Sequence, residues 1–438
     1  MFYLIIIIFV LGYAAIAFEE QISVDKAATA LITGILLWVC IAFVSDRIHG
    51  ELLKHLGEIS EILFFLLGAM TIVSTIDSHG CFNMFSKIIK TTNKVKLLWI
   101  FSFITFFMAA MMSNLTATIV TIAMINKLIG GKNTRWFFAS MMVLAANAGG
   151  AWSPIGDVTT IMLWIGGQVT ALSIITKVFL PSLVCLLVPL MIVSFILPGE
   201  IIPPSRSDRE KSKVETTERE RWIVLLTGIL GLLCVPIFRF FTDLPPYMGI
   251  MLVLAILWTV TEILHHNKQK KIKARLSIAG GILKKIDMPT IFFFLGILLA
   301  VAALQTGGHL YLVGLFLDEK ISDVYAINII IGALSSVVDN VPLVAGAMGM
   351  YEIVSPDKLI LISDPMKLEY LKNFMVDGDF WKLLAYCAGT GGSILIIGSA
   401  AGVAAMGMAQ INFLWFLKKI SWLAIIGYLS GIVAYFLL

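Results

Sequence analysis

Two carboxylates stand inside apolar stretches of this sequence, each within a short polar motif. Asp157 closes the motif that begins at Asn147-Ala148-Gly149-Gly150, and Asp339 opens the motif Asp339-Asn340-Val341-Pro342. A carboxylate in a low-dielectric environment resists ionisation until a proton or a metal ion neutralises it. One such group can hold a cation or a proton but not both, and this competition is the chemistry of an exchanger.

Each acid has a matching position in the other half of the chain that carries serine instead. Ser113-Asn114-Leu115-Thr116 matches the Asp339 motif, and the stretch from Gly389 to Ser399 matches the Asp157 motif. Side-chain oxygens accompany both acids, and hard oxygen ligands suit a small dehydrated cation such as sodium. The residues expected to bind a cation or a proton are Asp157, Asp339, Asn114, Asn340, Ser113, Thr116, Thr159, Thr160, Ser393 and Ser399, with sodium itself at Asp157, Asp339, Asn114 and Asn340.

Backbone interruptions are expected at the same motifs. Non-helical backbone at membrane depth must have its N–H and C=O groups satisfied by neighbours or trapped water, so it implies a polar cavity. Proline obstructs a helix and removes a donor, while paired glycines let helices approach closely. The expected breaks are Gly149, Gly150, Pro342, Gly391 and Gly392. The structural alternative is that Asp157 and Asp339 only cap helices beside these breaks, but the duplication of the motifs favours transport.

The composition indicates an integral membrane protein. Of the 438 residues, 59% are hydrophobic and only 14% are charged, whereas soluble domains are roughly 45–50% apolar. Many apolar stretches reach the ~20 residues that a helix needs to cross a bilayer. The net charge of +4 gives no support for nucleic-acid binding. The predicted uninterrupted spans are 1–18, 27–44, 61–76, 171–197, 222–241, 246–264, 289–306 and 419–438.

The same order of elements occurs twice, and Phe65-Leu66-Leu67-Gly68 is similar to Phe293-Phe294-Leu295-Gly296 at the corresponding position. Repeats with interrupted helices are typical of secondary transporters, whose site lies between the halves. The predicted fold is an all-α polytopic membrane protein, an inverted repeat of about five spans and one re-entrant hairpin per half. The predicted parts are a first repeat 1–200 (hairpin 97–129, interrupted helix 136–170), a charged cytoplasmic linker 201–221, and a second repeat 222–438 (hairpin 324–354, interrupted helix 380–416).

Lys and Arg residues indicate the orientation, because cytoplasmic loops carry them in excess. Basic residues between Lys87 and Lys96 precede the first hairpin, and others between Lys127 and Arg135 follow it, so both its ends are expected in the cytoplasm. The second hairpin has few basic residues around it and is expected to open outward. The basic segment 268–285 and Lys418-Lys419 then also face the cytoplasm, and both termini lie outside.

The remaining ionisable residues are expected to be structural. Asp77 and His79, near the end of a span, are expected to form an interfacial cap in preference to a proton relay. His265 and His266 stand beside the basic segment and are expected to be solvated, and His309 is expected in an external loop. The five cysteines are scattered through apolar stretches and are expected to behave as small hydrophobic side chains.

The motifs Ser113-Asn114-Leu115-Thr116, Asp157-Val158-Thr159-Thr160, Ser335 to Pro342 and Gly391 to Gly398 resemble those of NhaD-type sodium/proton antiporters. That family belongs to the ion transporter superfamily, together with arsenite permeases and sodium-coupled dicarboxylate carriers. The resemblance implies a multi-pass protein of the bacterial inner membrane, a homodimer without a cofactor, which expels its substrate sodium or lithium in exchange for protons. The functional residues that it implies are Asn114, Asp157, Thr159, Thr160, Ser335, Asp339 and Asn340.

The chain departs from the family pattern at Ser113, where members usually carry Asp, and near Ser74, where an acid is usual. Fewer carboxylates leave the exchange ratio open. The alternatives are a sodium-coupled dicarboxylate symporter, an arsenite permease, and an intramembrane aspartyl protease with Asp157 and Asp339 as its dyad. A buried carboxylate would repel a dicarboxylate, and the protease motif needs Gly where Pro154 stands, so a transporter and not an enzyme is expected.

Overall fold

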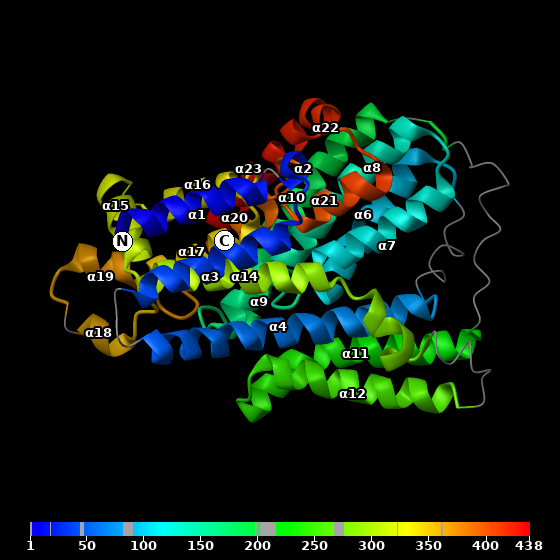
Figure 1. Ribbon diagram of the computed structural model, residues 1–438. Coiled ribbons are helices and arrows are strands. Elements are labelled where there is room, and N and C mark those ends of the chain that lie inside the picture. The colour runs from blue at the N-terminus through cyan, green and yellow to red at the C-terminus, as the bar shows by residue number, and fades with distance from the viewer. Residues whose placement is uncertain are drawn as a thin grey trace.

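The computed structural model of the protein describes residues 2–17, 19–43, 48–81, 91–197, 199–201, 216–266, 276–321, 323–360 and 362–438. Helices form most of this described part (Figure 1), and an isolated β-bridge pairs Asn93 with Glu200. Most of the predicted linker 201–221 and residues 268–275 of the basic segment fall outside the described residues, as do Lys87 and Lys90. The all-α class predicted from the sequence is confirmed.

The helices follow the predicted order closely. The helices before residue 201 are α1 (Phe2–Ala17), α2 (Glu19–Ile22), α3 (Lys26–Ala42), α4 (Ile48–Ser78), α6 (Lys94–Met112), α7 (Asn114–Leu128), α8 (Lys132–Ala151), α9 (Val158–Ile165) and α10 (Ala171–Ile196). The later helices are α11 (Glu218–Thr242), α12 (Pro246–Leu264), α14 (Met288–Thr306), α15 (His309–Lys320), α16 (Val324–Leu334), α17 (Asn340–Met350), α18 (Pro356–Ile360), α19 (Pro365–Lys372), α20 (Asp379–Gly391), α21 (Ala400–Ala409), α22 (Phe413–Lys419) and α23 (Ser421–Phe436). A short π-turn at Ile278–Ile282 and a 3-10 turn at Leu283–Lys285 lead into α14.

The chain is a multi-pass membrane protein. Among the described helices, α4, α6, α10, α11, α12 and α14 are apolar and long enough to cross a bilayer. Helices α21 and α22 meet the same criterion as a pair and bend by 115° between them. Helices α1, α3, α7, α16, α17 and α23 are shorter apolar helices.

Helix α4 is much longer than the predicted span 61–76, because its first turns are amphipathic. His55 and Ile59 are buried, whereas Glu51, Lys54 and Glu58 are exposed. Because of these charges, the apolar pattern begins only at residue 61. The helix itself begins earlier, since helical periodicity places the charges on one face.

The two interrupted helices break slightly later than the Gly-Gly pairs. Helix α8 continues to Ala151, and the stretch 152–157 separates it from α9. Helix α20 ends at Gly391, and the stretch 392–399 separates it from α21. Gly149, Gly150 and Gly391 therefore lie in the last helical turns before the breaks, and Gly392 is the C-cap of α20 at the start of the second break.

Pro342 lies in the first turn of α17, whose N-cap is Asp339. A proline is tolerated there because the N–H groups of the first turn have no partner within the helix. The interruption of this segment is the stretch 335–339, which precedes the proline.

Three histidines lie in surroundings that the sequence did not indicate. His265 is 1% exposed and stacks on His79, with 5.0 Å between the ring centroids and 3.2 Å between the Nε2 atoms, so its predicted solvation is wrong. His309 is buried at the start of α15 and stacks on Phe2, and a helix therefore replaces the predicted loop.

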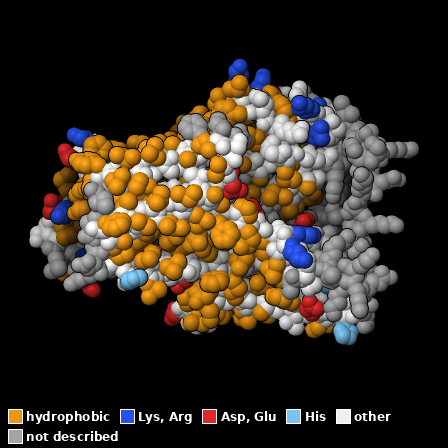
Figure 2. Space-filling model, viewed as in Figure 1, with side chains coloured by type: hydrophobic (Ala, Val, Ile, Leu, Met, Phe, Trp, Pro, Cys, Tyr) orange, Lys and Arg blue, Asp and Glu red, His pale blue; other side chains and the backbone are white. Residues whose placement is uncertain are grey.

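Helices α8 and α20 form the centre of the molecule. All residues from Phe138 to Ala151 in α8 and from Phe380 to Gly391 in α20 are buried. Helices α6 and α7 pack on α8, α16 and α17 pack on α20, and α10 packs along α23. Further out, α3 packs along α14, and α12 packs along α4. Figure 2 shows a broad band of hydrophobic side chains, with most charged side chains towards its two ends.

One end of the molecule collects basic residues, and we call it the basic end. The backbone of Asn93, before α6, pairs with that of Glu200, after α10, and Lys285 Nζ donates to Ser78 Oγ at 3.1 Å (Figure 1, right). The described basic residues at this end include Lys94, Lys96, Lys132, Arg135 and Lys285.

Candidate functional site

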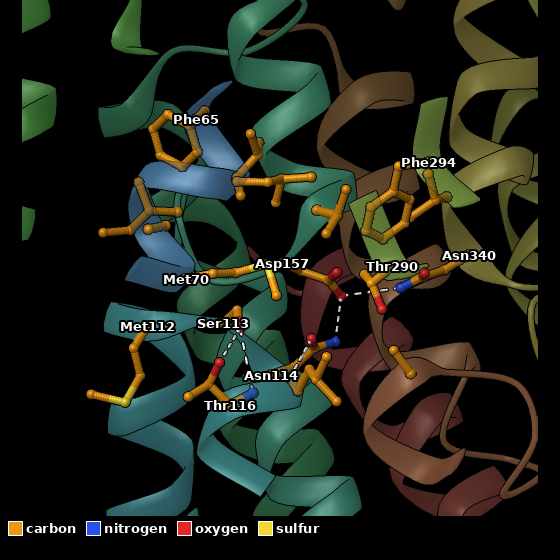
Figure 3. Close-up of a pocket in the computed structure, with 18 of the residues that line it drawn as sticks. Phe65, Met70, Met112, Ser113, Asn114, Thr116, Asp157, Thr290, Phe294 and Asn340 are labelled. Carbon is orange, nitrogen blue, oxygen red and sulfur yellow. Dashed lines mark hydrogen bonds between the residues drawn. The ribbon is translucent and has the colours of Figure 1, made fainter. Parts of the chain in front are cut away.

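Four helix N-termini meet at one small cavity in the centre of the molecule. The N-cap residues are Ser113 for α7, Asp157 for α9, Asp339 for α17 and Ser399 for α21. The cavity has a volume of about 60 Å³ and is lined by residues from the first turn of each of these helices (Figure 3). Both predicted acids therefore lie at one cavity, and both are also helix N-caps.

Asp157 is the most enclosed carboxylate of this site, at 2% exposure. Its Oδ2 accepts hydrogen bonds from Asn114 Nδ2 at 3.0 Å and from Asn340 Nδ2 at 3.1 Å (Figure 3). One amide comes from the first half of the chain and the other from the second. Within the described residues, no basic side chain forms a salt bridge with Asp157, so neutral amides are its side-chain partners.

The stretch before Asp157 is held against the start of α7. The backbone N–H of Asn114 donates to the Gly156 carbonyl at 3.0 Å, and Ser153 Oγ donates to the Ala110 carbonyl at 2.5 Å. Thr160 Oγ1 accepts from the Asp157 backbone N–H and donates to its carbonyl. These bonds satisfy non-helical backbone at membrane depth, as such backbone requires.

Asn147 belongs to the site although sequence analysis noted it only as the start of a motif. Its Oδ1 accepts from Asn114 Nδ2 at 3.1 Å, and its Nδ2 donates to the hydroxyls of Ser393 and Ser399, each at 2.9 Å. Asn147 is completely buried. It thus joins the amide that binds Asp157 to the break in the second half.

Asp339 is more accessible than Asp157. Its carboxylate accepts from the Val341 backbone N–H at 3.2 Å, as an N-cap does. It lines the central cavity and also a second cavity of about 410 Å³, which Tyr13 and Lys26 share. The two acids therefore differ in access although both are helix N-caps at the same central cavity.

The other predicted residues divide into two groups. Ser113 and Thr116 line the central cavity, and their hydroxyls lie 3.1 Å apart. The Thr159 hydroxyl is buried and has no hydrogen-bond partner among the described residues, and Ser335 Oγ donates to the Ala388 carbonyl. Thr159, Thr160 and Ser335 do not line the central cavity; Thr160 shapes the break before α9.

The glycines of the motifs allow backbone to pass close to backbone. A Cβ on Gly149 would overlap the Phe106 carbonyl of α6, and a Cβ on Gly391 would overlap the Gly332 carbonyl of α16. Ala and larger residues are therefore excluded at these two contacts. The glycines bring α6 and α16 against the two central helices that carry the breaks.

The cavity has a balanced electrostatic environment. Each helix N-terminus carries roughly half a positive charge, so four of them supply about +2. The two carboxylates, when ionised, supply the opposite charge. Buried charges are tolerated only when they are compensated, and here the helix ends stabilise both acids without a permanent cation in contact with Asp157.

The central cavity adjoins wider cavities on one side. A cavity of about 530 Å³ reaches the basic end, where Asp77 and Lys285 line it, and it shares Thr116 and Thr290 with the central cavity. Towards the opposite end, Phe65 bounds the central cavity and its ring meets the edge of Trp164. Beyond this contact lies a separate cavity of about 430 Å³ that shares no lining residue with the central one.

Comparison with known proteins gives one consistent family. Residues 13–366 match the citrate transporter family (CitMHS). "Sodium/proton antiporter 2" of Arabidopsis thaliana is 40% identical over 98% of this chain and 98% of its own length, and "Sodium/proton antiporter 1" is 42% identical over 98% and 71%. "Na(+)/H(+) antiporter NhaD" of Vibrio cholerae is 32% identical over 100% of this chain and 91% of its own length. The chain therefore belongs to the NhaD family of sodium/proton antiporters, transport proteins and not enzymes, within the wider citrate transporter family.

Proposed function

We propose that the protein exchanges sodium or lithium ions for protons across the membrane, with Asp157 and Asp339 as the groups that bind cation and proton in turn. The observation that carries this proposal is the pair of carboxylates at one small central cavity. Two amides bind one of them, and neither has a basic side chain in salt-bridge contact among the described residues. Such acids need a proton or a metal ion to stay neutral when the cavity is sealed.

The chemistry of the cavity favours a cation over a dicarboxylate. Four helix N-termini would attract an anionic substrate, but Asp157 and Asp339 already provide the two negative charges that these termini stabilise. A free dicarboxylate would meet two fixed carboxylates in about 60 Å³. Sodium is small and accepts carboxylate, amide and hydroxyl oxygens, which the cavity offers at Asn114, Ser113 and Thr116.

We propose further that the two halves, 1–200 and 222–438, form an inverted repeat around this cavity. Reciprocal packing supports the proposal: α3 of the first half packs on α14 of the second, and α12 of the second packs on α4 of the first. Likewise α7 packs on α21, and α17 packs on α9. The predicted hairpins differ, since α6 and α7 pack side by side around Ser113, whereas α16 packs mainly on α20 and α17 on α14.

The basic end is proposed to face the cytoplasm, as the excess of Lys and Arg indicates. The central cavity adjoins the wide cavity of this end and is separated from the opposite one by Phe65 and Trp164. The structure then corresponds to an inward-facing state. Bacterial inner-membrane location and a homodimer are expectations from the family resemblance, and the relatives in Arabidopsis thaliana indicate that the membrane differs between members.

Everted membrane vesicles test the proposal directly. Addition of sodium or lithium should dissipate an imposed pH gradient in vesicles with the wild-type protein, and Asp157→Asn and Asp339→Asn should each abolish this effect. Asparagine keeps the shape and the N-cap function of both residues. Asp323→Asn is the matched control, because exposed Asp323 caps α16 in the same way and lies outside the site.

Citrate, succinate and arsenite are tested alongside. The symporter or permease would be established instead if the wild-type protein transported one of these anions and sodium dissipated the pH gradient no more than in vesicles without the protein. Full activity of Asp339→Asn would remove Asp339 from the mechanism.

A further inference from the structure

Lys26 is the basic residue that lines the second cavity together with Asp339, among the residues that the structure describes. It is the first residue of α3 and lies half-buried. It also lines the cavity that leads to the basic end, so it stands where the two wider cavities meet. Its position at a cavity wall gives its ammonium access to the acid without a change of the fold.

The ammonium of Lys26 is held by an aromatic ring. Its Nζ lies 4.8 Å from the centroid of Phe293, over the face of the ring, where a cation is attracted by the ring's electrons. Phe293 is buried in α14, and the next residue, Phe294, lines the central cavity. Among the described residues, Lys26 forms no salt bridge with any carboxylate, although it lines the same cavity as Asp339.

We infer that the Lys26 ammonium is a tethered counter-cation of Asp339, which a sodium ion must displace or oppose in order to bind. This inference rests on the proposed function. While the site is empty, the charge of Lys26 adds to that of the helix ends in stabilising ionised Asp339, and its repulsion weakens the hold of Asp339 on any bound cation. A site that must release sodium in every cycle benefits from this limit on affinity.

The backbone around Lys26 fixes where its side chain begins. The Lys26 N–H donates to Glu19 Oε1 at 3.1 Å, and Asp25 caps α3 through the Ala27 N–H. Other ionisable groups also face these two cavities, and a substitution at Lys26 leaves their side chains in place. They are Tyr13, Glu19, Asp25, Asp77, Asp287 and Lys285.

Substitution of Lys26 separates this role from a structural one. Lys26→Met removes the charge and keeps the length and the contact with Phe293, and Lys26→Arg keeps the charge. Lys285→Met is the matched control, because Lys285 lines the cavity at the basic end but not the one that contains Asp339, and it donates to Ser78.

The assay is sodium-dependent proton movement in proteoliposomes at a fixed alkaline pH, with calorimetric sodium binding to the purified proteins. Lys26→Met should lower the half-saturating sodium concentration and the sodium dissociation constant severalfold, because it removes a unit positive charge that repels the bound cation across the cavity shared with Asp339. Lys26→Arg and Lys285→Met should stay near the wild type.

Unchanged or weaker sodium binding in Lys26→Met would overturn the inference while the proposed function stands, provided that the wild type exchanges sodium for protons. A wild type without sodium-dependent proton movement would instead overturn the proposed function. If Lys26→Met does not give a monodisperse protein, Lys26→Gln is measured in its place, with the same expected change.

Discussion

Conversion of Asn147 to aspartate tests whether a negative charge next to Asp157 raises the affinity of the site for sodium. The side-chain amide of Asn114 donates both to Asn147 Oδ1 at 3.1 Å and to Asp157 Oδ2 at 3.0 Å. The two acceptor oxygens are therefore at most about 6 Å apart, the sum of these distances, and a second charge at Asn147 would interact with Asp157 by about 2.8 kcal/mol at an effective dielectric constant of about 20. The variant keeps the shape of the side chain, and the Ser393 and Ser399 hydroxyls can turn to donate to the carboxylate.

The added charge strengthens the hold of the site on any cation. A cation bound to Asp157 would lie at a similar distance from the new carboxylate, so their attraction is also about 2.8 kcal/mol, which corresponds to about a hundredfold in a dissociation constant. We therefore expect Asn147→Asp to lower the half-saturating sodium concentration by about a hundredfold at alkaline pH, where protons compete least. The maximal rate should fall as well, because tighter binding slows release.

The assay is sodium-dependent proton movement in proteoliposomes, with direct sodium binding by calorimetry as a second measurement that does not require turnover. Asn412→Asp is the matched control, because Asn412 is an exposed N-cap of α22 and aspartate caps equally well. A wild-type sodium dissociation constant in Asn147→Asp would refute the reasoning, since it would mean that Asp157 does not take part in holding the cation.

Two further predictions concern the glycine contact and the access route. Gly391→Ala should destabilise the protein by about 1–3 kcal/mol, the usual range for overpacking, because the new Cβ overlaps the Gly332 carbonyl. Gly407→Ala is the control and should not destabilise the protein, since its Cβ meets no atom within 4 Å. Melting curves of the purified variants in detergent measure the difference, and equal melting temperatures would contradict the close approach of α16 and α20. In a cysteine-free background, Ser74→Cys should react with a membrane-impermeant maleimide only from the cytoplasmic side, and Glu58→Cys should react only from outside. The reason is that Ser74 lines the cavity of the basic end and Glu58 lines the cavity of the opposite end. The reverse labelling would invert the proposed orientation.

The sequence indicated which residues meet at the central cavity better than it indicated their hydrogen-bond partners. The duplicated motifs identified Asp157, Asp339, Asn114 and Asn340, because a polar residue inside an apolar stretch is conspicuous in any pattern of hydropathy. The role of Asn147 was missed because its partners Ser393 and Ser399 are 246 and 252 positions away in the chain. No local pattern indicates which distant hydroxyls a buried amide will meet.

The differences in the fold have similar physical origins. Hydropathy placed the start of α4 at residue 61, yet the amphipathic turns from Ile48 onward are stabilised by packing and not by uniform apolar character. The basic neighbourhood of His265 suggested solvent, but the end of α12 meets the end of α4, and the two histidine rings bury each other. Tertiary contact overrides local composition in both cases.

Exchange of Ser and Asp between the two motifs explains how one cavity comes to contain two unequal acids. Each half supplies one break with an acid and one with a serine, so the N-caps of the four helices carry two charges and not four. Four carboxylates would exceed the charge of about +2 that four helix ends supply, and the excess would require permanently bound cations. With two acids the empty cavity can stay neutral, and only small differences decide which cation each acid holds. Those differences are on the surface of the cavity: Asp157 is clamped by Asn114 and Asn340, whereas Asp339 opens towards Lys26. In the proposed cycle, this inequality lets the two acids differ in the order in which they take up and release a cation or a proton.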